Sequence, residues 1–268
     1  MALFRGSIRS DVLKMDTTVN VIFPEAHYVA PKTENRTLIL LHGLKQNADT
    51  WQRMSRVESY VHPANFNVII PEVQRSWYAD MAYGINYFRY IAEELPEMMG
   101  RMFRIPMDRD HLFAAGLSMG GYGAVKCALT YPDRFAGAMS FSGALSILEN
   151  PDAMMTIMSR EELMGIIGPD LRCGDEQSLA RLAGKAAASV QKPRLYIACG
   201  TEDALIGDNR NMALLTRDLG FDIVFEEWPG HHDWEFWDRA LVRGMSVMTG
   251  LDANEINPLY AVQPMKTL

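Results

Sequence analysis

The stretch that decides the fold is FAAGLSMGGYGAV, residues 113–125, in which one serine stands between two glycines and further glycines follow. It continues an apolar run that begins at Leu112 and opens a helical pattern that ends near Tyr131, just before Pro132. A strand that turns sharply into a helix is the context that a catalytic G-x-S-x-G motif requires. We therefore predict that Ser118 is a nucleophile on a strained turn. The alternative is a patch of small residues at which a helix packs against a sheet.

Similar apolar runs recur along the chain and alternate with helical patterns. Most of them are almost continuously hydrophobic, which is typical of strands that helices bury on both faces. The first run alternates instead, which predicts an early antiparallel strand. This order predicts an α/β fold with a mostly parallel central sheet and helices on both faces. The expected strands are 17–24, 36–43, 66–71, 111–116, 135–141, 194–200 and 221–228, and the clearest helical patterns are 85–95, which Pro96 should kink or end, and 237–248.

The domain organisation follows from the length and from one irregular segment. A chain of 268 residues without a visible linker predicts a single domain over residues 1–268. Residues 146–191 break the alternation, because they carry helical pieces and no clear strand. This segment is either an ordinary crossover between strands or a cap over the site, and we favour the cap.

Charge and composition argue against several classes of partner. The net charge is -7 and the pI about 5.4, which disfavours binding to nucleic acid or to an anionic membrane surface. No apolar run reaches the length of about 18 residues that a membrane span needs, and the N-terminal residues lack a signal-peptide pattern, so we expect a cytoplasmic protein. The three cysteines lack metal-ligand spacing, so we expect neither a metal nor another cofactor. The sequence leaves homo-oligomerisation open.

A serine hydroxyl is a weak nucleophile and needs a base and a carboxylate that orients the base. The expected strand 194–200 opens into Thr-Glu-Asp, which places carboxylates at the carboxyl end of a parallel strand. We assign the carboxylate to Asp203, with Glu202 as the local alternative and Asp208 as a more distant one. The base is one of the two histidines that follow the serine, His231 or His232, and spacing from the strand does not choose between them.

The reaction also needs donors for the oxyanion and a pocket for the substrate. The run Leu-His-Gly-Leu ends the first buried strand, where the second oxyanion donor lies in folds with this turn. We assign the oxyanion hole to the backbone N–H groups of Leu44 and Met119, and interpret His42 as structural. Four residues are expected to line the pocket, with plain core packing as the alternative: Ser76, Trp77, Tyr78 and Trp234.

Five segments together resemble the esterase D-like family of α/β-hydrolases, and most of all its bacterial tributyrin and acetyl esterases. They are residues 40–51, 71–96, 116–124, 199–203 and 232–238. The resemblance implies the α/β-hydrolase fold and a cofactor-free serine carboxylesterase that hydrolyses small-molecule esters of short acyl chains, acetyl to butyryl. In relatives the residue matching His232 is the base, so the resemblance favours His232 over His231, although position 231 departs from the family pattern.

The same family includes S-formylglutathione hydrolases and feruloyl and acetylxylan esterases, so the alcohol or thiol half of the substrate stays open. A thioesterase of the S-formylglutathione type is therefore one alternative, and an acyltransferase to a sugar or alcohol acceptor is another. A non-catalytic binding module on this fold would be expected to lack a member of the triad, and Ser118, Asp203 and His232 are all present.

Overall fold

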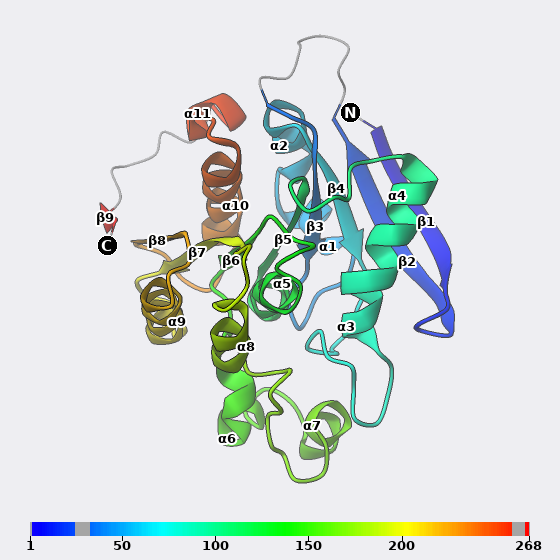
Figure 1. The fold of residues 1–268 in the computed structure, drawn as a ribbon, viewed down its shortest axis with the longest axis vertical. Coiled ribbons are helices and arrows are strands. Elements are labelled where there is room, and N and C mark those ends of the chain that lie inside the picture. Colours follow the sequence, from blue (N-terminus) through cyan, green and yellow to red (C-terminus); the bar gives the residue numbers. More distant parts are fainter. Residues whose placement is uncertain (1, 25–32, 259–265, 268) are drawn as a thin grey trace.

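The computed structural model describes residues 2–24, 33–258 and 266–267. Its centre is a single sheet with the strand order β1-β2-β4-β3-β5-β6-β7-β8-β9 (Figure 1). Neighbouring strands from β4 through β8 pair in parallel, whereas β1 and β2 pair antiparallel at one end and β9 at the other. The predicted mostly parallel sheet and the early antiparallel strand are therefore confirmed. The strands are β1 Ala2–Ser10, β2 Met15–Phe23, β3 Arg36–Leu41, β4 Phe66–Pro71, β5 Leu112–Leu117, β6 Gly137–Phe141, β7 Arg194–Gly200, β8 Ile223–Trp228 and β9 Lys266–Thr267.

Helices cover both faces of the sheet. One hydrophobic cluster contains α1, α2, α10 and α11 on one face, and a second contains α4, α5, α8 and α9 on the other (Figure 1). This two-sided cover explains why β4, β5 and β6 are buried along their whole length. No helix in the described part of the chain is long and apolar enough to cross a membrane. The helices are α1 Thr50–Met54, α2 Val57–Ala64, α3 Tyr87–Arg89, the π-helix η1 Tyr90–Glu94, α4 Leu95–Phe103, α5 Met119–Thr130, the 3-10 helix η2 Ile147–Glu149, α6 Pro151–Met154, α7 Arg160–Ile167, α8 Leu179–Ala186, α9 Ile206–Asp218, α10 Trp234–Thr249 and α11 Ala253–Ile256.

Two elements of the N-terminal half, the first strand and the helix that contains Pro96, differ from the sequence prediction. Strand β1 was not predicted, because it lies at the sheet edge and only Ile8 and Ser10 of its residues are buried, so no apolar pattern marks it. The helix of residues 85–95 does not end at Pro96. It passes through the π-helical turn η1 and continues as α4, whose second residue is Pro96. Because a π-helical turn is a recognised site of helix kinks, the other predicted effect of Pro96, a kink, is not contradicted.

The segment of residues 146–191, all of which are described, contains helices η2, α6, α7 and α8 and no strand. Helix α8 packs against α5, which follows the predicted nucleophile. The Tyr122 hydroxyl of α5 also donates to Gln177 O at 2.7 Å. The segment therefore lies against the helix that begins at the site, and its action as a cap stays a prediction.

Candidate active site

Ser118 occupies the sharp turn between β5 and α5. Its φ of 53° and ψ of -118° lie in a region of the backbone map that residues other than glycine rarely adopt. Two hydrogen bonds hold the turn: the Ser118 N–H donates to Phe141 O at 3.0 Å, and the Ala144 N–H donates to Ser118 O at 3.2 Å. The strained turn predicted from the sequence is therefore confirmed, and its serine lines a pocket at the carboxyl end of β5.

Glycines flank Ser118 because the backbone segments here approach too closely for a side chain. A Cβ on Gly116 would lie 2.4 Å from the Gly120 carbonyl, and a Cβ on Gly120 would lie 2.4 Å from Leu41 O in β3. Both separations are below 3.0 Å, which Cβ atoms essentially never show. Helix α5 therefore starts directly against the central strands, and this contact fixes the position of the Ser118 hydroxyl at the sheet edge.

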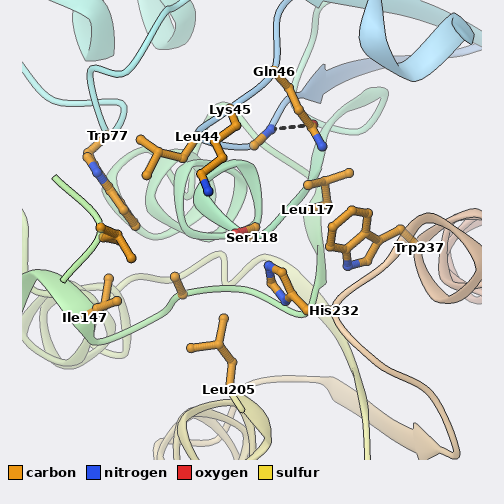
Figure 2. Close-up of a pocket in the computed structure, with 13 residues that line it drawn as sticks. Leu44, Lys45, Gln46, Trp77, Leu117, Ser118, Ile147, Leu205, His232 and Trp237 are labelled. Carbon is orange, nitrogen blue, oxygen red and sulfur yellow. Dashed lines mark hydrogen bonds between the residues drawn. The ribbon is translucent and has the colours of Figure 1, made fainter. Parts of the chain in front are cut away.

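The structure brings Asp203 and His232 together from two loops that follow neighbouring strands. Asp203 follows β7, His232 follows β8, and His232 Nδ1 lies 2.8 Å from Asp203 Oδ2. Because a carboxylate only accepts hydrogen bonds, the proton of this bond lies on Nδ1, which leaves Nε2 free to accept another proton. The His232 ring points toward Ser118 across the pocket that both residues line (Figure 2).

Asp203 is suited to hold the histidine because its carboxyl is buried and ionised. Burial raises the pKa of this carboxyl, but the hydrogen bonds from His232 and from the Leu205 N–H outweigh burial and leave the pKa below its ordinary value. The side chain is only 1% exposed, so the negative charge is directed to its hydrogen-bond donors rather than to solvent. Such a charge stabilises an imidazolium beside it.

The alternative carboxylates have other partners, and the alternative histidine lies outside the pocket. Glu202 accepts from the Gly230 N–H at 2.5 Å and so supports the loop that precedes the histidines. Asp208 accepts from both the backbone and the side chain of Ser146, which ties α9 to the start of the 146–191 segment. The side chain of His231 is exposed and does not line the pocket.

The two predicted oxyanion donors belong to residues next to the site. Met119 opens α5 directly after the serine, and Leu44 follows β3 and lines the pocket. Within the residues that the structure describes, neither backbone N–H has a hydrogen-bond acceptor. Unused N–H groups beside a nucleophile at a helix N-terminus are what an oxyanion hole requires.

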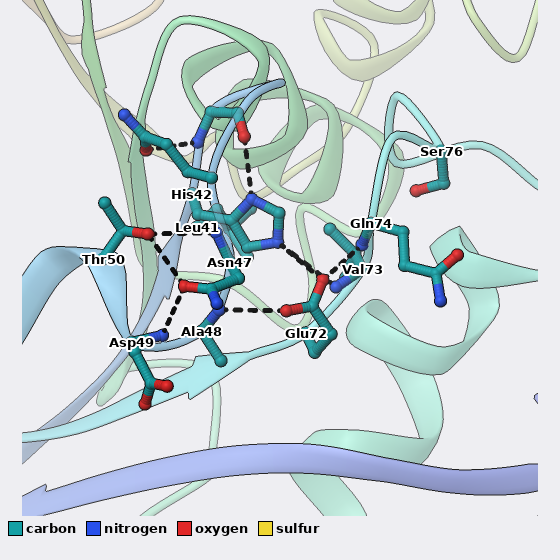
Figure 3. Close-up of polar contacts among 12 residues, drawn as sticks. Leu41, His42, Asn47, Ala48, Asp49, Thr50, Glu72, Val73, Gln74 and Ser76 are labelled. Atoms are coloured by element: carbon teal, nitrogen blue, oxygen red, sulfur yellow. Dashed lines mark hydrogen bonds and ion pairs between the residues drawn. The ribbon is translucent and has the colours of Figure 1, made fainter.

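His42 has a structural environment, as the sequence suggested. It is fully buried, its Nδ1 donates to Gly43 O at 2.9 Å, and its Nε2 accepts from the Val73 N–H at 3.3 Å (Figure 3). Glu72 lies 3.4 Å from Nε2 and also accepts from the Ala48 N–H. These contacts join the loops after β3 and β4 behind the site, and they leave neither imidazole nitrogen free for proton transfer.

The pocket is a small, mainly apolar cavity of about 360 Å³. Of the predicted pocket residues it contains Trp77, and it also contains side chains that the sequence analysis missed. Among the lining residues that were not predicted, Ile147 and Ile157 come from the 146–191 segment. The last helix contributes its second tryptophan, Trp237, rather than the predicted Trp234. The lining residues are Gly43, Leu44, Lys45, Gln46, Trp77, Leu117, Ser118, Ala144, Ile147, Ile157, Leu205, His232 and Trp237 (Figure 2).

Three predicted pocket residues lie elsewhere, for reasons of local packing. Ser76 is buried and its hydroxyl accepts from the Tyr78 N–H. The Tyr78 ring fills the space left by Gly123 of α5, and its hydroxyl donates to His42 O at 2.8 Å. Trp234 packs edge-on between Trp51 and Trp237 (ring centroids 5.1 and 5.4 Å away), so it supports the wall of the pocket without forming it.

No group of three or more His, Cys, Asp or Glu side chains that could hold a metal ion occurs among the residues described. Two of the three cysteines, Cys127 and Cys199, are fully buried, and Cys173 is partly buried. Burial raises the pKa of the Cys127 and Cys199 thiols to about 12. These two thiols are thus held in the protonated, unreactive form.

The geometry can be compared with known proteins. The model of the Esterase family matches residues 10–247, which is most of the chain. The chain belongs to the Esterase family. An acetyl esterase from Caldicellulosiruptor saccharolyticus is 31% identical to this esterase over 267 residues, which cover 93% of this chain and 98% of that protein.

Solved structures agree with this assignment. The fluorophosphonate-binding serine hydrolase FphF of Staphylococcus aureus is 34% identical with a TM-score of 0.83, and the alignment covers 92% of this esterase and 98% of that chain. The S-formylglutathione hydrolase FrmB of Staphylococcus aureus is 33% identical with a TM-score of 0.80, at the same coverage. The α/β-hydrolase fold and the resemblance to the esterase D-like family are confirmed. The protein is an enzyme of the carboxylic ester hydrolase class.

Proposed function

We propose that this esterase hydrolyses short-chain carboxylic esters, from acetyl to butyryl, through an acyl-enzyme formed on Ser118. The observation that carries the proposal is the 2.8 Å bond between His232 and Asp203 at the edge of the pocket that also holds the strained serine. A nucleophile, an oriented imidazole and a buried carboxylate are the parts that two-stage acyl transfer needs.

In the first stage His232 takes the Ser118 proton as Oγ attacks the ester carbonyl carbon. The carbonyl oxygen becomes an oxyanion, which accepts hydrogen bonds from the Leu44 and Met119 N–H groups. The imidazolium then gives its proton to the departing alcohol, and the acyl group stays on Oγ. In the second stage a water molecule loses its proton to His232 and attacks the acyl carbon. The bond from the acyl carbon to Oγ then breaks, the imidazolium returns its proton to Oγ, and the acid leaves.

The size of the pocket supports a short acyl chain. Its volume of about 360 Å³ is at the lower end of the range of roughly 300–1,000 Å³ typical of ligand sites. Its walls are apolar and include Ile157, and Ile147 and Leu205 lie on the side that Figure 2 shows below Ser118. The acetyl esterase of Caldicellulosiruptor saccharolyticus, to which this chain is similar over its length, agrees with such a substrate.

The experiment is a series of p-nitrophenyl esters from acetyl to octanoyl, assayed with the parent enzyme and with Ser118→Ala. We expect kcat/KM to be highest between acetyl and butyryl and to disappear with Ser118→Ala. Labelling by a fluorophosphonate should require Ser118 as well. Equal turnover of octanoyl and butyryl esters would contradict the short-chain assignment, and labelling of Ser118→Ala would contradict the nucleophile.

A thioesterase of the S-formylglutathione type is a second candidate, since S-formylglutathione hydrolases occur among both the sequence relatives and the structural neighbours. The same site would act, with a thiol in place of the alcohol as the leaving group. Comparison of kcat/KM for S-formylglutathione with that for p-nitrophenyl acetate separates the two. An acyltransferase would be recognised by ester products that form when a sugar or alcohol acceptor is added.

A further inference from the structure

Lys45 places a positive charge at the rim of a pocket that is otherwise mainly apolar. Its side chain is exposed, lines the pocket and directs its ammonium group inward toward Ser118 (Figure 2). No aspartate or glutamate in the described part of the chain lies within ion-pair distance of this ammonium. The pocket lining also contains no carboxylate, so the charge of Lys45 has no protein counterion at the site.

The backbone that carries Lys45 is fixed rather than loose. Residues 43–46 form a turn closed by the Gln46 N–H, which donates to Gly43 O at 3.1 Å, and by the Gly43 N–H, which donates to Gln46 Oε1 at 2.9 Å. The buried His42 anchors the start of this turn. Lys45 therefore stands beside Leu44 in the same turn, and only its side-chain torsions are free.

The electrostatic setting gives this charge a consequence for substrate choice. The chain as a whole carries a net charge of -7, which repels anions at long range. A single unpaired cation over an apolar pocket offsets this repulsion locally, because its interaction with a bound anion is stronger where the walls exclude water. An alkyl ester without charge gains nothing from such a cation.

We propose that Lys45 binds an anionic group of the substrate, so that the preferred substrates are carboxylic esters that also carry a carboxylate. The proposal rests on the proposed ester hydrolysis at Ser118 and names the substrate class for that site. The proposal covers a carboxylate on the alcohol half and one at the far end of the acyl chain, and the test below distinguishes the two.

The test compares two matched pairs of esters. 4-Acetoxybenzoate and its methyl ester differ by a charge on the leaving group, and mono-4-nitrophenyl glutarate and its methyl ester differ by a charge on the acyl chain. Each pair is assayed with the parent, Lys45→Met, Lys45→Glu and Lys45→Arg, after subtraction of spontaneous hydrolysis. The readout is the ratio of kcat/KM for the charged ester to kcat/KM for its neutral partner.

We expect Lys45→Met to lower this ratio by about 3- to 10-fold in one of the two pairs, a size that an ion pair at a pocket rim can supply. Lys45→Glu should lower it further and Lys45→Arg should preserve it. Added NaCl should lower the ratio of the parent enzyme and leave that of Lys45→Met unchanged, because salt screens exposed charges. The pair that responds identifies the half of the substrate that carries the carboxylate.

The control is Arg5→Met, which removes a positive charge from the exposed edge strand β1 and should leave the ratio as it is. Equal ratios in the parent and in Lys45→Met for both pairs would overturn the proposal. So would a loss of kcat that is equal for charged and neutral esters, since Lys45 would then act on the oxyanion. If Ser118-dependent turnover were absent for all four esters, the proposed function would fail instead.

Discussion

Ser118 holds a conformation that costs roughly 1–3 kcal/mol and that the surrounding turn nevertheless maintains. Its N–H and its C=O are both bonded to the segment of residues 141–144, which belongs to the neighbouring strand and its loop. The backbone at this position is therefore held independently of the side chain. A change of the side chain should affect the chemistry and leave the fold intact.

We predict that Ser118→Ala lowers kcat for p-nitrophenyl acetate by about 10³-fold or more, because no other hydroxyl takes the place of the nucleophile. The melting temperature should stay close to that of the parent, since the half-buried hydroxyl fills no core space. Circular dichroism with temperature, run beside the assay, checks both. Substantial turnover in a Ser118→Ala variant as stable as the parent would contradict the assignment of Ser118 as the nucleophile.

The two adjacent histidines provide a sharper comparison. We predict that His232→Ala lowers kcat by about 10³-fold or more, because both proton transfers depend on it. His231→Ala should cost less than about tenfold, since its exposed side chain has no contact with the pocket. Both variants are assayed on p-nitrophenyl acetate near pH 8. A larger loss in His231→Ala would make His231 the base.

A buried lysine in α5 makes stability depend on pH. Lys126 of α5 is 1% exposed, donates to Tyr78 O at 3.0 Å, and lies over the Phe88 ring at 4.2 Å. Burial lowers its pKa from 10.5 to about 8. Between these two values the unfolded chain binds more protons than the folded one, so the contribution of Lys126 to stability rises with pH in this window.

We predict that the free energy of unfolding of the parent, relative to that of Lys126→Met, rises by about 2 kcal/mol between about pH 7.5 and pH 10. Other titrating groups cancel in this difference because both proteins contain them. Urea unfolding at the two pH values measures it. A difference that stays flat over the window would mean that Lys126 keeps an ordinary affinity for its proton in the folded state.

At the scale of elements, the 146–191 segment contributes to the pocket through Ile147 and Ile157, which lie before and after helix α6. Shortening one of these side chains should enlarge the pocket and leave room for a longer acyl chain. We predict that Ile157→Ala raises the ratio of kcat/KM for the hexanoyl ester to that for the acetyl ester by about fivefold, the order expected for accommodating one or two more methylenes.

Val190 supplies the matched control, because it belongs to the same segment, is fully exposed and does not line the pocket. Val190→Ala should leave the ratio of hexanoyl to acetyl hydrolysis unchanged. If the ratio is the same in Ile157→Ala and in the parent, the wall formed by this segment does not limit the acyl chain.

The elements around the nucleophile were predictable because their signals are local. The apolar run of β5, the glycines of the turn and the helical pattern of α5 are contiguous in sequence, and the same holds for Asp203 directly after β7. Which tryptophan forms the pocket wall was not predictable. Trp234 and Trp237 both follow His232 closely, and only the packing of Trp234 between Trp51 and Trp237 decides it.

At the scale of the whole molecule, the sequence predicted the central sheet and the helices on both of its faces, but not its two edge strands. The buried strands carry continuous apolar runs because two layers of helices enclose them, whereas β1 is exposed and carries no pattern. Lys45, Ile157 and Leu205 converge on one pocket from three distant segments. Which residues from distant segments meet in one pocket depends on how the helices pack on the sheet, and the spacing of residues along the sequence does not predict this packing.

The placement of the site also has a consequence for protein synthesis. Ser118 follows the central strand β5, whereas Asp203 and His232 follow β7 and β8, so the ribosome makes the proposed nucleophile long before the proposed base. At about 5–20 residues per second, the delay is on the order of ten seconds. A chain that ends before β7 contains Ser118 but lacks both Asp203 and His232, so the proposed mechanism predicts that it does not hydrolyse esters. Under the proposed mechanism, hydrolysis therefore begins only after the C-terminal half of the chain has been made and has folded.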